Sequence, residues 1–219
     1  WQGDSDMQYV ENQGNAGIVI QVIESIHENA AYLSEIDGAT GDGDHGINMN
    51  KGFMMAKERI EDNASFSEAL KILGRTLVMD IGGSMGPIYG TMFSKLSRSM
   101  KNEEQISAEI FAAALKNAKE GLMDLAGAKE GDKTLVDTIA PAQRQFKASL
   151  ETGKNFAECL QAMKQGAEDG KNHTRELVAK IGRAARLGER SKGHLDAGAT
   201  SCCIILTTMA DAMIAALKE

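Results

Sequence analysis

The chain has few of the residues that interrupt helices or cross-link small folds. Only two prolines, Pro87 and Pro141, occur among 219 residues, and aromatic side chains make up 5%. The three cysteines are Cys159, Cys202 and Cys203. An odd number argues against a disulfide framework and fits a reduced cytosolic protein. We therefore expect these cysteines to pack as small apolar side chains, and we expect a cytoplasmic location.

Long apolar runs and excess positive charge are also missing. No stretch approaches the roughly 18 consecutive apolar residues of a membrane span, and the first residues lack the basic-then-apolar pattern of a signal segment. The net charge is −7, whereas a nucleic-acid surface normally has a basic face. We expect no membrane and no nucleic acid as partner. Residues 1–6 are set aside as an added or processed end.

The rest of the sequence is rich in helix formers. Ala, Leu, Met, Glu, Lys and Gln dominate between the turns, and alternating β-branched runs are scarce, so the sequence predicts an all-α fold. Ser65 with Glu68 and Asn155 with Glu158 predict capped helix starts, and Pro141 should kink the helix that contains it. We expect a single domain over residues 1–219 with about eight amphipathic helices, near 16–35, 46–61, 66–81, 87–100, 107–126, 134–150, 156–181 and 198–218.

Glycine is the one abundant turn residue. Most of the 23 glycines fall in four segments between predicted helices: DGATGDGDHG, GGSMGP, GAKEGDKT and GERSKGHLDAGAT. Backbone N–H groups in such a turn, with a helix dipole behind them, favour phosphate. If the segments meet at one end of a bundle, they form one anion-binding rim. No Walker A loop is present, and no GxGxxG follows a strand, which excludes P-loop and Rossmann sites.

Three carboxylates crowd the first of these segments. Asp37, Asp42 and Asp44 offer the oxygen ligands that Mg²⁺ and Ca²⁺ prefer. The spacing does not fit an EF-hand, because counting from Asp42 puts Phe53 where the bidentate Glu should be. A Mg²⁺ site shared with nucleotide phosphates fits better, since Mg²⁺ usually takes ligands from substrate phosphates. On spacing alone, a solvated acidic turn before a helix is the alternative.

The last glycine segment adds positive charge. Arg183 has the geometry to neutralise a phosphate through two hydrogen bonds, and Asp196 and Gly198 stand where they either cap the final helix or line a ligand. His45 and His194 lie in glycine segments, yet no Ser/His/Asp or Cys/His arrangement accompanies them, so we expect no nucleophile on this chain. The residues alone indicate a Mg²⁺–nucleotide site on a helical scaffold.

Four long motifs carry a resemblance to a known family. DGATGDGDHGINMNKGF, GGSMGPIYGTMF, GDKTLVD and GRAARLGERSKGHLDAGATS resemble, in this order, the nucleotide-binding L subunit of dihydroxyacetone kinases, and the match starts near residue 10. The resemblance implies an antiparallel up-and-down barrel of eight helices with the nucleotide at one end. It also implies a phosphotransferase subunit of glycerol metabolism with no catalytic residue of its own. Such a subunit presents phosphate to a ketose that a separate substrate-binding subunit holds.

The resemblance assigns site residues by position. Asp37, Asp42 and Asp44 would hold two Mg²⁺ ions. Two positions depart from the family pattern: Met85 stands where a hydroxyl is usual, and Ala197 where proline is usual. The expected contacts to ADP or ATP are His45, Gly46, Ile47, Asn48, Gly83, Ser84, Met85, Ala126, Gly127, Leu135, Arg183, Asp196, Ala197 and Gly198.

Several alternatives stay open at this point. We favour ADP as a bound cofactor that a phosphocarrier protein of the phosphoenolpyruvate-phosphotransferase system rephosphorylates, against an ordinary kinase that exchanges ATP. The ketose is dihydroxyacetone or a tetrulose. A homodimer is one possible oligomeric state, which the sequence leaves open. The rivals are a fatty-acid kinase nucleotide domain, whose acidic motif lacks the equivalent of His45, a regulator that binds transcription factors, and a lipid-binding helical module.

Overall fold

Helices form most of the fold between residues 7 and 219, the part of the chain that the computed structural model describes. The expectation for residues 1–6 lies outside this part. The all-α prediction is confirmed, with a small two-stranded sheet as the exception. The described elements are β1 (Tyr9–Glu11), α1 (Ala16–Glu28), α2 (Ala30–Thr40), α3 (His45–Arg59), α4 (Phe66–Asp80), α5 (Met85–Met100), β2 (Gln105–Ser107), α6 (Ala108–Ala126), α7 (Val136–Glu151), α8 (Phe156–His173), the 3₁₀ helices η1 (Thr174–Glu176) and η2 (Arg183–Ser191), and α9 (Ala197–Ala216).

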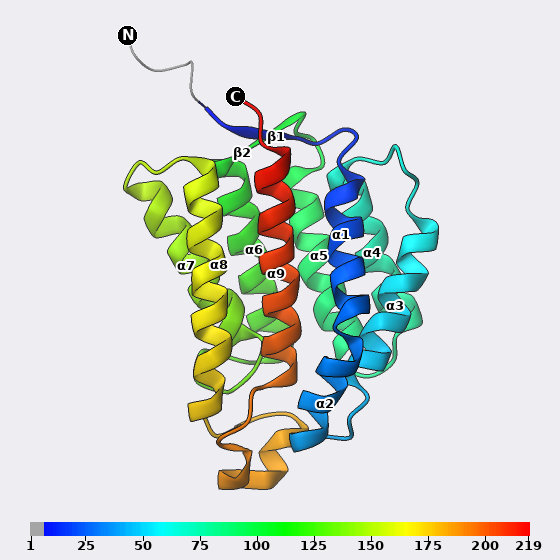
Figure 1. Cartoon of the computed structure of the whole chain (residues 1–219), viewed down its shortest axis with the longest axis vertical. Coiled ribbons are helices and arrows are strands. Elements are labelled where there is room, and N and C mark those ends of the chain that lie inside the picture. Colours follow the sequence, from blue (N-terminus) through cyan, green and yellow to red (C-terminus); the bar gives the residue numbers. More distant parts are fainter. Residues whose placement is uncertain (1–6) are drawn as a thin grey trace.

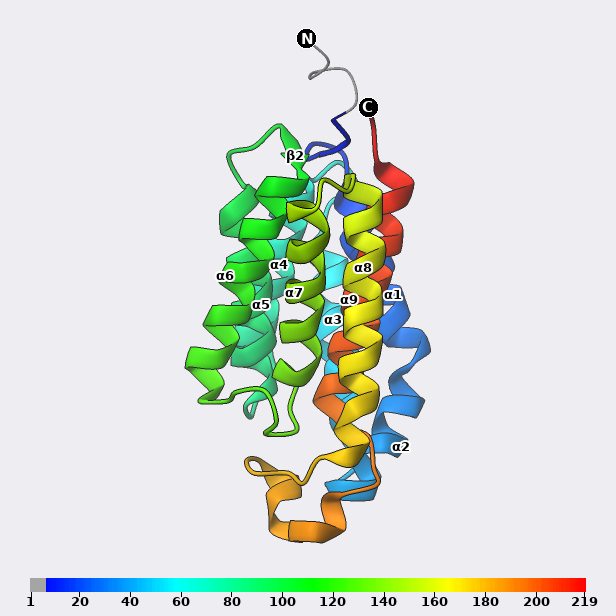
Figure 2. The same ribbon diagram turned by 90° about the vertical axis from the view of Figure 1, so that its left-hand side faces the viewer.

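The helices run up and down the long axis of the molecule and close into a ring (Figures 1 and 2). Each helix from α3 onward packs antiparallel to the one before it, and α9 packs against both α8 and α1, which closes the ring. Since α2 continues the direction of α1, the two count as one rod of the ring. The described residues thus form the eight-rod, up-and-down barrel that was expected.

Two helix boundaries differ from the sequence prediction. The helix expected over 16–35 is interrupted at Asn29, whose side chain donates to the Ser25 carbonyl at 2.8 Å. Asn competes in this way with the backbone pattern of a helix. After the interruption, α2 continues to Thr40, so Asp37 lies on a helix end and not in a loop. The helix expected over 156–181 ends at His173, where η1 begins.

Helix α8 approaches α7 closely at Pro141. Pro141 has no N–H to donate to the carbonyl of Asp137, although α7 continues through it as one helix. Two glycines of α8 face this point: a Cβ on Gly170 would lie 2.0 Å from the Asp137 carbonyl oxygen, and one on Gly166 2.5 Å from that of Pro141. Close backbone approach lets glycine Cα–H groups contact carbonyl oxygens. The proline and the glycine pair thus fit one another.

Apolar side chains fill the ring, with two groups of aromatic rings among them. By length and composition, α9 is apolar enough to cross a bilayer, with a mean hydropathy of 1.6 over 18 residues, but 61% of that window is buried in the protein. It is therefore the core helix of the bundle. The cysteines are free and buried, as expected. The aromatic groups are Phe53, Tyr89 and Phe93, and Phe111, Phe146 and Phe156.

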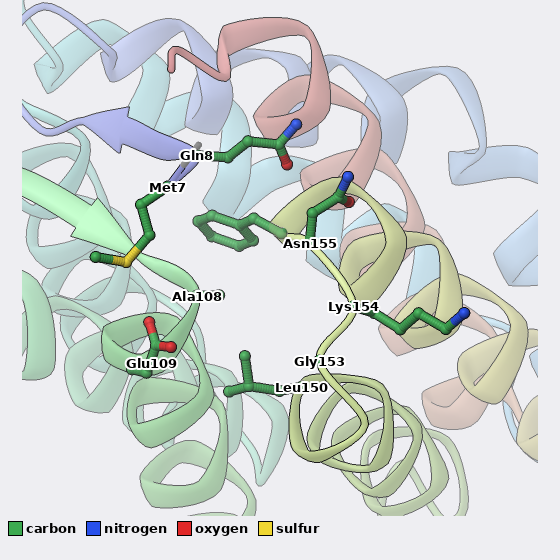
Figure 3. A pocket seen from close by; sticks show the side chains of 9 residues that line it. Met7, Gln8, Ala108, Glu109, Leu150, Gly153, Lys154 and Asn155 are labelled. Atoms are coloured by element: carbon green, nitrogen blue, oxygen red, sulfur yellow. The ribbon is translucent and has the colours of Figure 1, made fainter. Parts of the chain in front are cut away.

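The two ends of the ring differ. At one end β1 pairs antiparallel with β2, Val10 opposite Ile106, and Tyr9 also bridges to Lys218 beside the C-terminus. A cavity of about 340 Å³ lies at this end. In Figure 3 the Met7 side chain lies toward Ala108 and Glu109 of α6, and Gln8 toward Asn155 in the turn between α7 and α8. The Gln8 side chain accepts the N–H of Ala157 at 2.9 Å there. The four glycine segments lie at the opposite end (Figure 1).

Candidate functional site

The four glycine segments surround a cavity of about 570 Å³. Because the helices alternate in direction, α3, α5, α7 and α9 all begin at this end (Figure 1). A helix start presents N–H groups without partners inside the helix, together with the positive end of the helix dipole. The cavity volume falls within the range of small-molecule sites, about 300–1,000 Å³. This end of the bundle is therefore suited to an anionic ligand of nucleotide size.

The three aspartates form one cluster at the edge of the cavity. Asp37 lies near the end of α2, whereas Asp42 and Asp44 lie in the turn that leads into α3. One carboxylate oxygen from each lies within 4.8 Å of the others. The backbone N–H of His45 donates to Asp37 at 3.1 Å, which fixes this carboxylate. Three like charges at such separations repel one another unless a cation lies between them. The set consists of hard oxygen donors and fits Mg²⁺.

Arg183 reaches the acidic cluster from the other side of the cavity. It begins η2, and its guanidinium forms an ion pair with the carboxylate of Asp42. Both side chains are about half exposed (58% and 46%), so the pair itself adds little stability. The contact shows instead that the Arg183 guanidinium lies beside the carboxylates that suit a metal. One ligand can therefore reach both the guanidinium, which would neutralise phosphate, and the acidic cluster.

The turn between α4 and α5 supplies free backbone donors. Gly83 has φ +74°, a left-handed conformation that an L-residue rarely adopts. Ser84 is the N-cap of α5 but its side chain caps no N–H group, so the first turn of α5 keeps donors for an anion. Met85 packs against the apolar core together with Ile88. The hydrophobic side chain at position 85, where the resemblance implies a hydroxyl, therefore has a packing role.

A buried chain of polar groups holds His45 in place. Its Nε2 lies 2.9 Å from the Ser201 hydroxyl, which in turn lies 2.5 Å from the Tyr89 hydroxyl. Both hydroxyl oxygens also lie 3.1 Å from the Gly198 carbonyl oxygen, which accepts from one of them while the other hydroxyl proton serves the Tyr89–Ser201 contact. Burial lowers the pKa of His45, while Asp37 opposes this, so the neutral imidazole is favoured. Ser201 of α9 and Tyr89 of α5 thus fix the orientation of the His45 ring.

Asp196 is the N-cap of α9 and lines the cavity. Its carboxylate accepts the Ala199 N–H at 2.8 Å and thereby caps the helix. Burial raises the pKa of Asp196 to about 6, although the bond from Ala199 and the charge of Lys133 act in the opposite direction. Burial conversely lowers the pKa of Lys133, and the charges of Asp196 and Asp137 oppose this. The two side chains are thus electrostatic partners beneath the cavity.

The raised pKa of Asp196 predicts a pH dependence of stability. The folded protein binds the proton more tightly than the unfolded chain, so this group costs stability above pH 6, and the cost is relieved as the pH falls toward 4. Relative to Asp196→Asn, which keeps a capping oxygen, the wild type should gain about 1–2 kcal/mol between pH 7.5 and 4.5. Urea unfolding of both proteins across this range checks it. Parallel pH profiles would contradict the assignment.

Eleven of the fourteen expected nucleotide contacts line the cavity, and three lie off its wall. Gly46 is buried where a Cβ would come 1.8 Å from the Ala30 carbonyl, so it allows α3 to begin against α2. Ile47 is 66% exposed. Gly127 is the left-handed cap of α6. The eleven are His45, Asn48, Gly83, Ser84, Met85, Ala126, Leu135, Arg183, Asp196, Ala197 and Gly198.

Sequence reasoning missed part of the site. Lys133 lies in the quoted GDKT motif, but nothing in the sequence shows that it is 2% exposed with φ +66°. Tyr89 and Ser201 lie 112 positions apart, and only the folded chain joins them. The apolar wall was also not predicted, although it suits the flat face of a nucleobase. Its larger members are Met49, Ile81, Ile88, Leu125 and Ile181.

Comparisons with known proteins find a matching family and several relatives. The DAK2 domain family matches residues 39–211. The chain is 33% identical over 181 residues to the ADP-binding subunit DhaL of the PEP-dependent dihydroxyacetone kinase of Escherichia coli K12, covering 82% of this chain and 86% of that subunit. It is 35% identical over 195 residues to the L-erythrulose kinase of Pectobacterium atrosepticum, covering 87% of this chain but 32% of that longer enzyme.

A solved structure shares the fold. The dihydroxyacetone kinase of C. freundii in complex with AMP-PNP and Mg²⁺ matches with a TM-score of 0.65 and 21% identity, over 96% of this chain and 36% of that one. At this identity the match concerns the fold alone.

Proposed function

This chain belongs to the DAK2 domain family, and from that premise we propose that it is the nucleotide-binding subunit of a dihydroxyacetone-type kinase. In this role it holds Mg-ADP or Mg-ATP at the glycine-segment end and presents a phosphoryl group to a short-chain ketose in the cytoplasm. A separate substrate-binding subunit carries the ketose. The observation that carries the proposal is the cluster of Asp37, Asp42 and Asp44 beside Arg183 at the mouth of a nucleotide-sized cavity.

The residues of the cavity divide the ligand between them. Asp37, Asp42 and Asp44 would hold two Mg²⁺ ions, which supply charge neutralisation for phosphate oxygens. The starts of α3, α5 and α9 donate backbone N–H groups, and Arg183 adds a charged fork. The apolar wall takes the base. Catalysis on this chain is then positioning plus neutralisation of charge, which phosphoryl transfer mainly requires.

Two features support a subunit that works with partners. The hydroxyl in hydrogen-bonding reach of His45 belongs to Ser201, which is 0% exposed and does not line the cavity, so a ketose could not reach it for covalent attachment. The Escherichia coli relative is named as an ADP-binding subunit of a PEP-dependent kinase, which supports ADP as resident cofactor and a phosphocarrier protein as second partner. The relative named as an L-erythrulose kinase supports a tetrulose as the alternative ketose. ATP that exchanges freely, as in an ordinary kinase, is the alternative phosphoryl donor.

The nucleotide content of the purified protein tests the proposal. We expect denaturation to release ADP and Mg²⁺ in near-stoichiometric amounts after extensive dialysis, as measured by ion-pair chromatography and atomic emission. An empty protein that binds added Mg·ATP reversibly would favour the exchanging kinase. A protein that neither carries nor binds nucleotide in the presence of Mg²⁺ would refute the site.

A further inference from the structure

We propose that Lys133 is a positioning residue that fastens residues 174–195 over the nucleotide cavity and thereby makes nucleotide release slow. This inference rests on the proposed function and deepens it, because slow release is what separates a resident cofactor from an exchanging substrate. Residues 174–195, here called the lid, connect α8 to α9 and form the lowest part of the molecule in Figure 1.

The lid forms one wall of the cavity. Ile181, Gly182, Arg183 and Ala184 line it from this side, opposite the starts of α3 and α5. The lid also packs against α2 through η2. A ligand in the cavity is therefore enclosed between the helix ends and the lid, and it cannot leave on the lid side unless the lid moves.

Lys133 ties together both ends of the lid from a different loop. It lies between α6 and α7, and its ammonium donates to the carbonyls of Thr174 at 2.6 Å, Leu177 at 3.2 Å and His194 at 2.5 Å. The first two carbonyls lie where the lid begins, and the third lies where it ends. One side chain thus holds three points that are up to 20 positions apart.

Two further hydrogen bonds join the chain at the two ends of the lid, residues 174–177 and 193–196, which are here called the neck. The N–H of Gly193 donates to the Arg175 carbonyl at 2.7 Å, and the N–H of Asp196 donates to the Thr174 hydroxyl at 3.1 Å. A backbone hydrogen bond also joins the lid to the loop between α6 and α7, since the N–H of Lys180 donates to the carbonyl of Asp132 at 3.2 Å. Asp196 also lines the cavity, so the neck positions a cavity residue directly.

The conformation of Lys133 is costly, which argues against an incidental contact. The residue is 2% exposed, and φ +66° is unfavourable for a residue with a Cβ. A buried ammonium persists only when hydrogen bonds and opposite charges replace water. Here three carbonyls do so, with Asp196 and Asp137 as nearby charges. Without the ammonium, the carbonyls of the neck would regain water only if the lid opened.

The lid is positively charged, so its closed position places positive charge over the cavity. Residues 174–195 contain six Lys or Arg and two Asp or Glu, in a chain whose net charge is −7. A basic segment held over the aspartate cluster and a nucleotide strengthens the retention of anions. Fastening it in place favours a ligand that stays bound.

The test compares nucleotide dissociation from the wild type, Lys133→Met and Thr174→Val. Each protein is loaded with Mg²⁺ and a fluorescent ADP analogue, and the analogue is displaced by excess ADP in a stopped-flow instrument. We expect the nucleotide to dissociate about tenfold faster or more from Lys133→Met. A tenfold change in rate corresponds to about 1.4 kcal/mol, which is close to the net contribution of one hydrogen bond. Thr174→Val, which removes only the hydroxyl at the neck, should show a smaller acceleration. The matched control is Lys129→Met, an exposed lysine of the same loop, which should behave as wild type.

Hydrogen exchange on the same proteins separates a loosened lid from a damaged fold. In Lys133→Met, the amides of Ala179, Gly193 and Asp196 should lose protection, while those of Val10 and Ile106 at the far end should not. Wild-type release rates in both neck variants would overturn the inference, as would equal loss of protection at both ends. If Lys133→Met does not fold, Thr174→Val decides. A wild type that binds no Mg-nucleotide would instead defeat the proposed function itself, a result visible before any variant is measured.

Discussion

Asp44→Asn should abolish Mg²⁺-dependent nucleotide binding and lower phosphoryl transfer by the assembled kinase roughly a thousandfold, the scale of several kcal/mol of lost charge stabilisation. Asp44 gives the cleanest test of the cluster. Asp42 also pairs with Arg183, and Asp37 also accepts a backbone N–H. The Asp44 side chain caps no N–H group although the residue is the N-cap of α3, so its removal should disturb the fold least.

The stability of the ligand-free protein gives this prediction a second readout. Removing one of three crowded carboxylates relieves repulsion, so Asp44→Asn should melt at the wild-type temperature or above it without Mg²⁺. Added Mg²⁺ and ADP should raise the melting temperature of the wild type only, by mass action. The matched control is Asp124→Asn, an exposed aspartate near the end of α6, which should keep binding and activity. Full nucleotide affinity in Asp44→Asn would remove Asp44 from the metal site.

Gly170→Ala should destabilise the protein by about 3 kcal/mol or more, the upper part of the range for overpacked sites. The added methyl would lie 2.0 Å from the Asp137 carbonyl oxygen, a backbone atom that cannot move without shifting α7. Because alanine is the better helix former by about 0.5–1 kcal/mol, intrinsic propensity predicts the opposite sign. The measurement is urea unfolding with a constant m-value.

A glycine with open surroundings supplies the control for this experiment. Gly17 in α1 has no atom within 4 Å of its would-be Cβ, so Gly17→Ala should be neutral or stabilising by up to about 1 kcal/mol. If Gly170→Ala were as harmless as Gly17→Ala, the close packing of α7 and α8 described here would be wrong. Because Asp137 also accepts the N–H groups of Gly131 and Thr134, a shift of α7 should also reach the cavity loop.

Local signals were enough to predict most of the helices. Ser65 and Asn155 cap the N–H groups of Glu68 and Glu158, as the sequence pattern indicated. Both signals act over three residues, so tertiary structure had little chance to override them. The break at Asn29 was missed because apolar spacing continues across it, and a single Asn side chain redirects the chain there. Boundaries set by one side chain are the hardest to predict from pattern.

The candidate site divides in the same way. Glycine segments and clustered aspartates are contiguous in sequence, so the position of the cavity and its acidic edge could be predicted. Lys133 and the chain from His45 through Ser201 to Tyr89 could not, since their partners are 41 to 156 positions away. For such groups, burial and hydrogen bonding arise only when the ring closes.

The placement of β1 and the end of α9 has a consequence for tethering. Both termini of the described chain leave from the sheet end, and α9 alone separates that end from the cavity by about 30 Å, at 1.5 Å for each of its 20 residues. A catalytic partner fused to either terminus would need a linker that spans this length before it could meet the nucleotide. With a shorter linker, the effective concentration of the tethered partner at the cavity would be close to zero, because the partner could not reach it. Fusion at either terminus leaves the nucleotide end unobstructed, so linker length would help to decide whether a fused partner works on its own subunit or on a neighbour's.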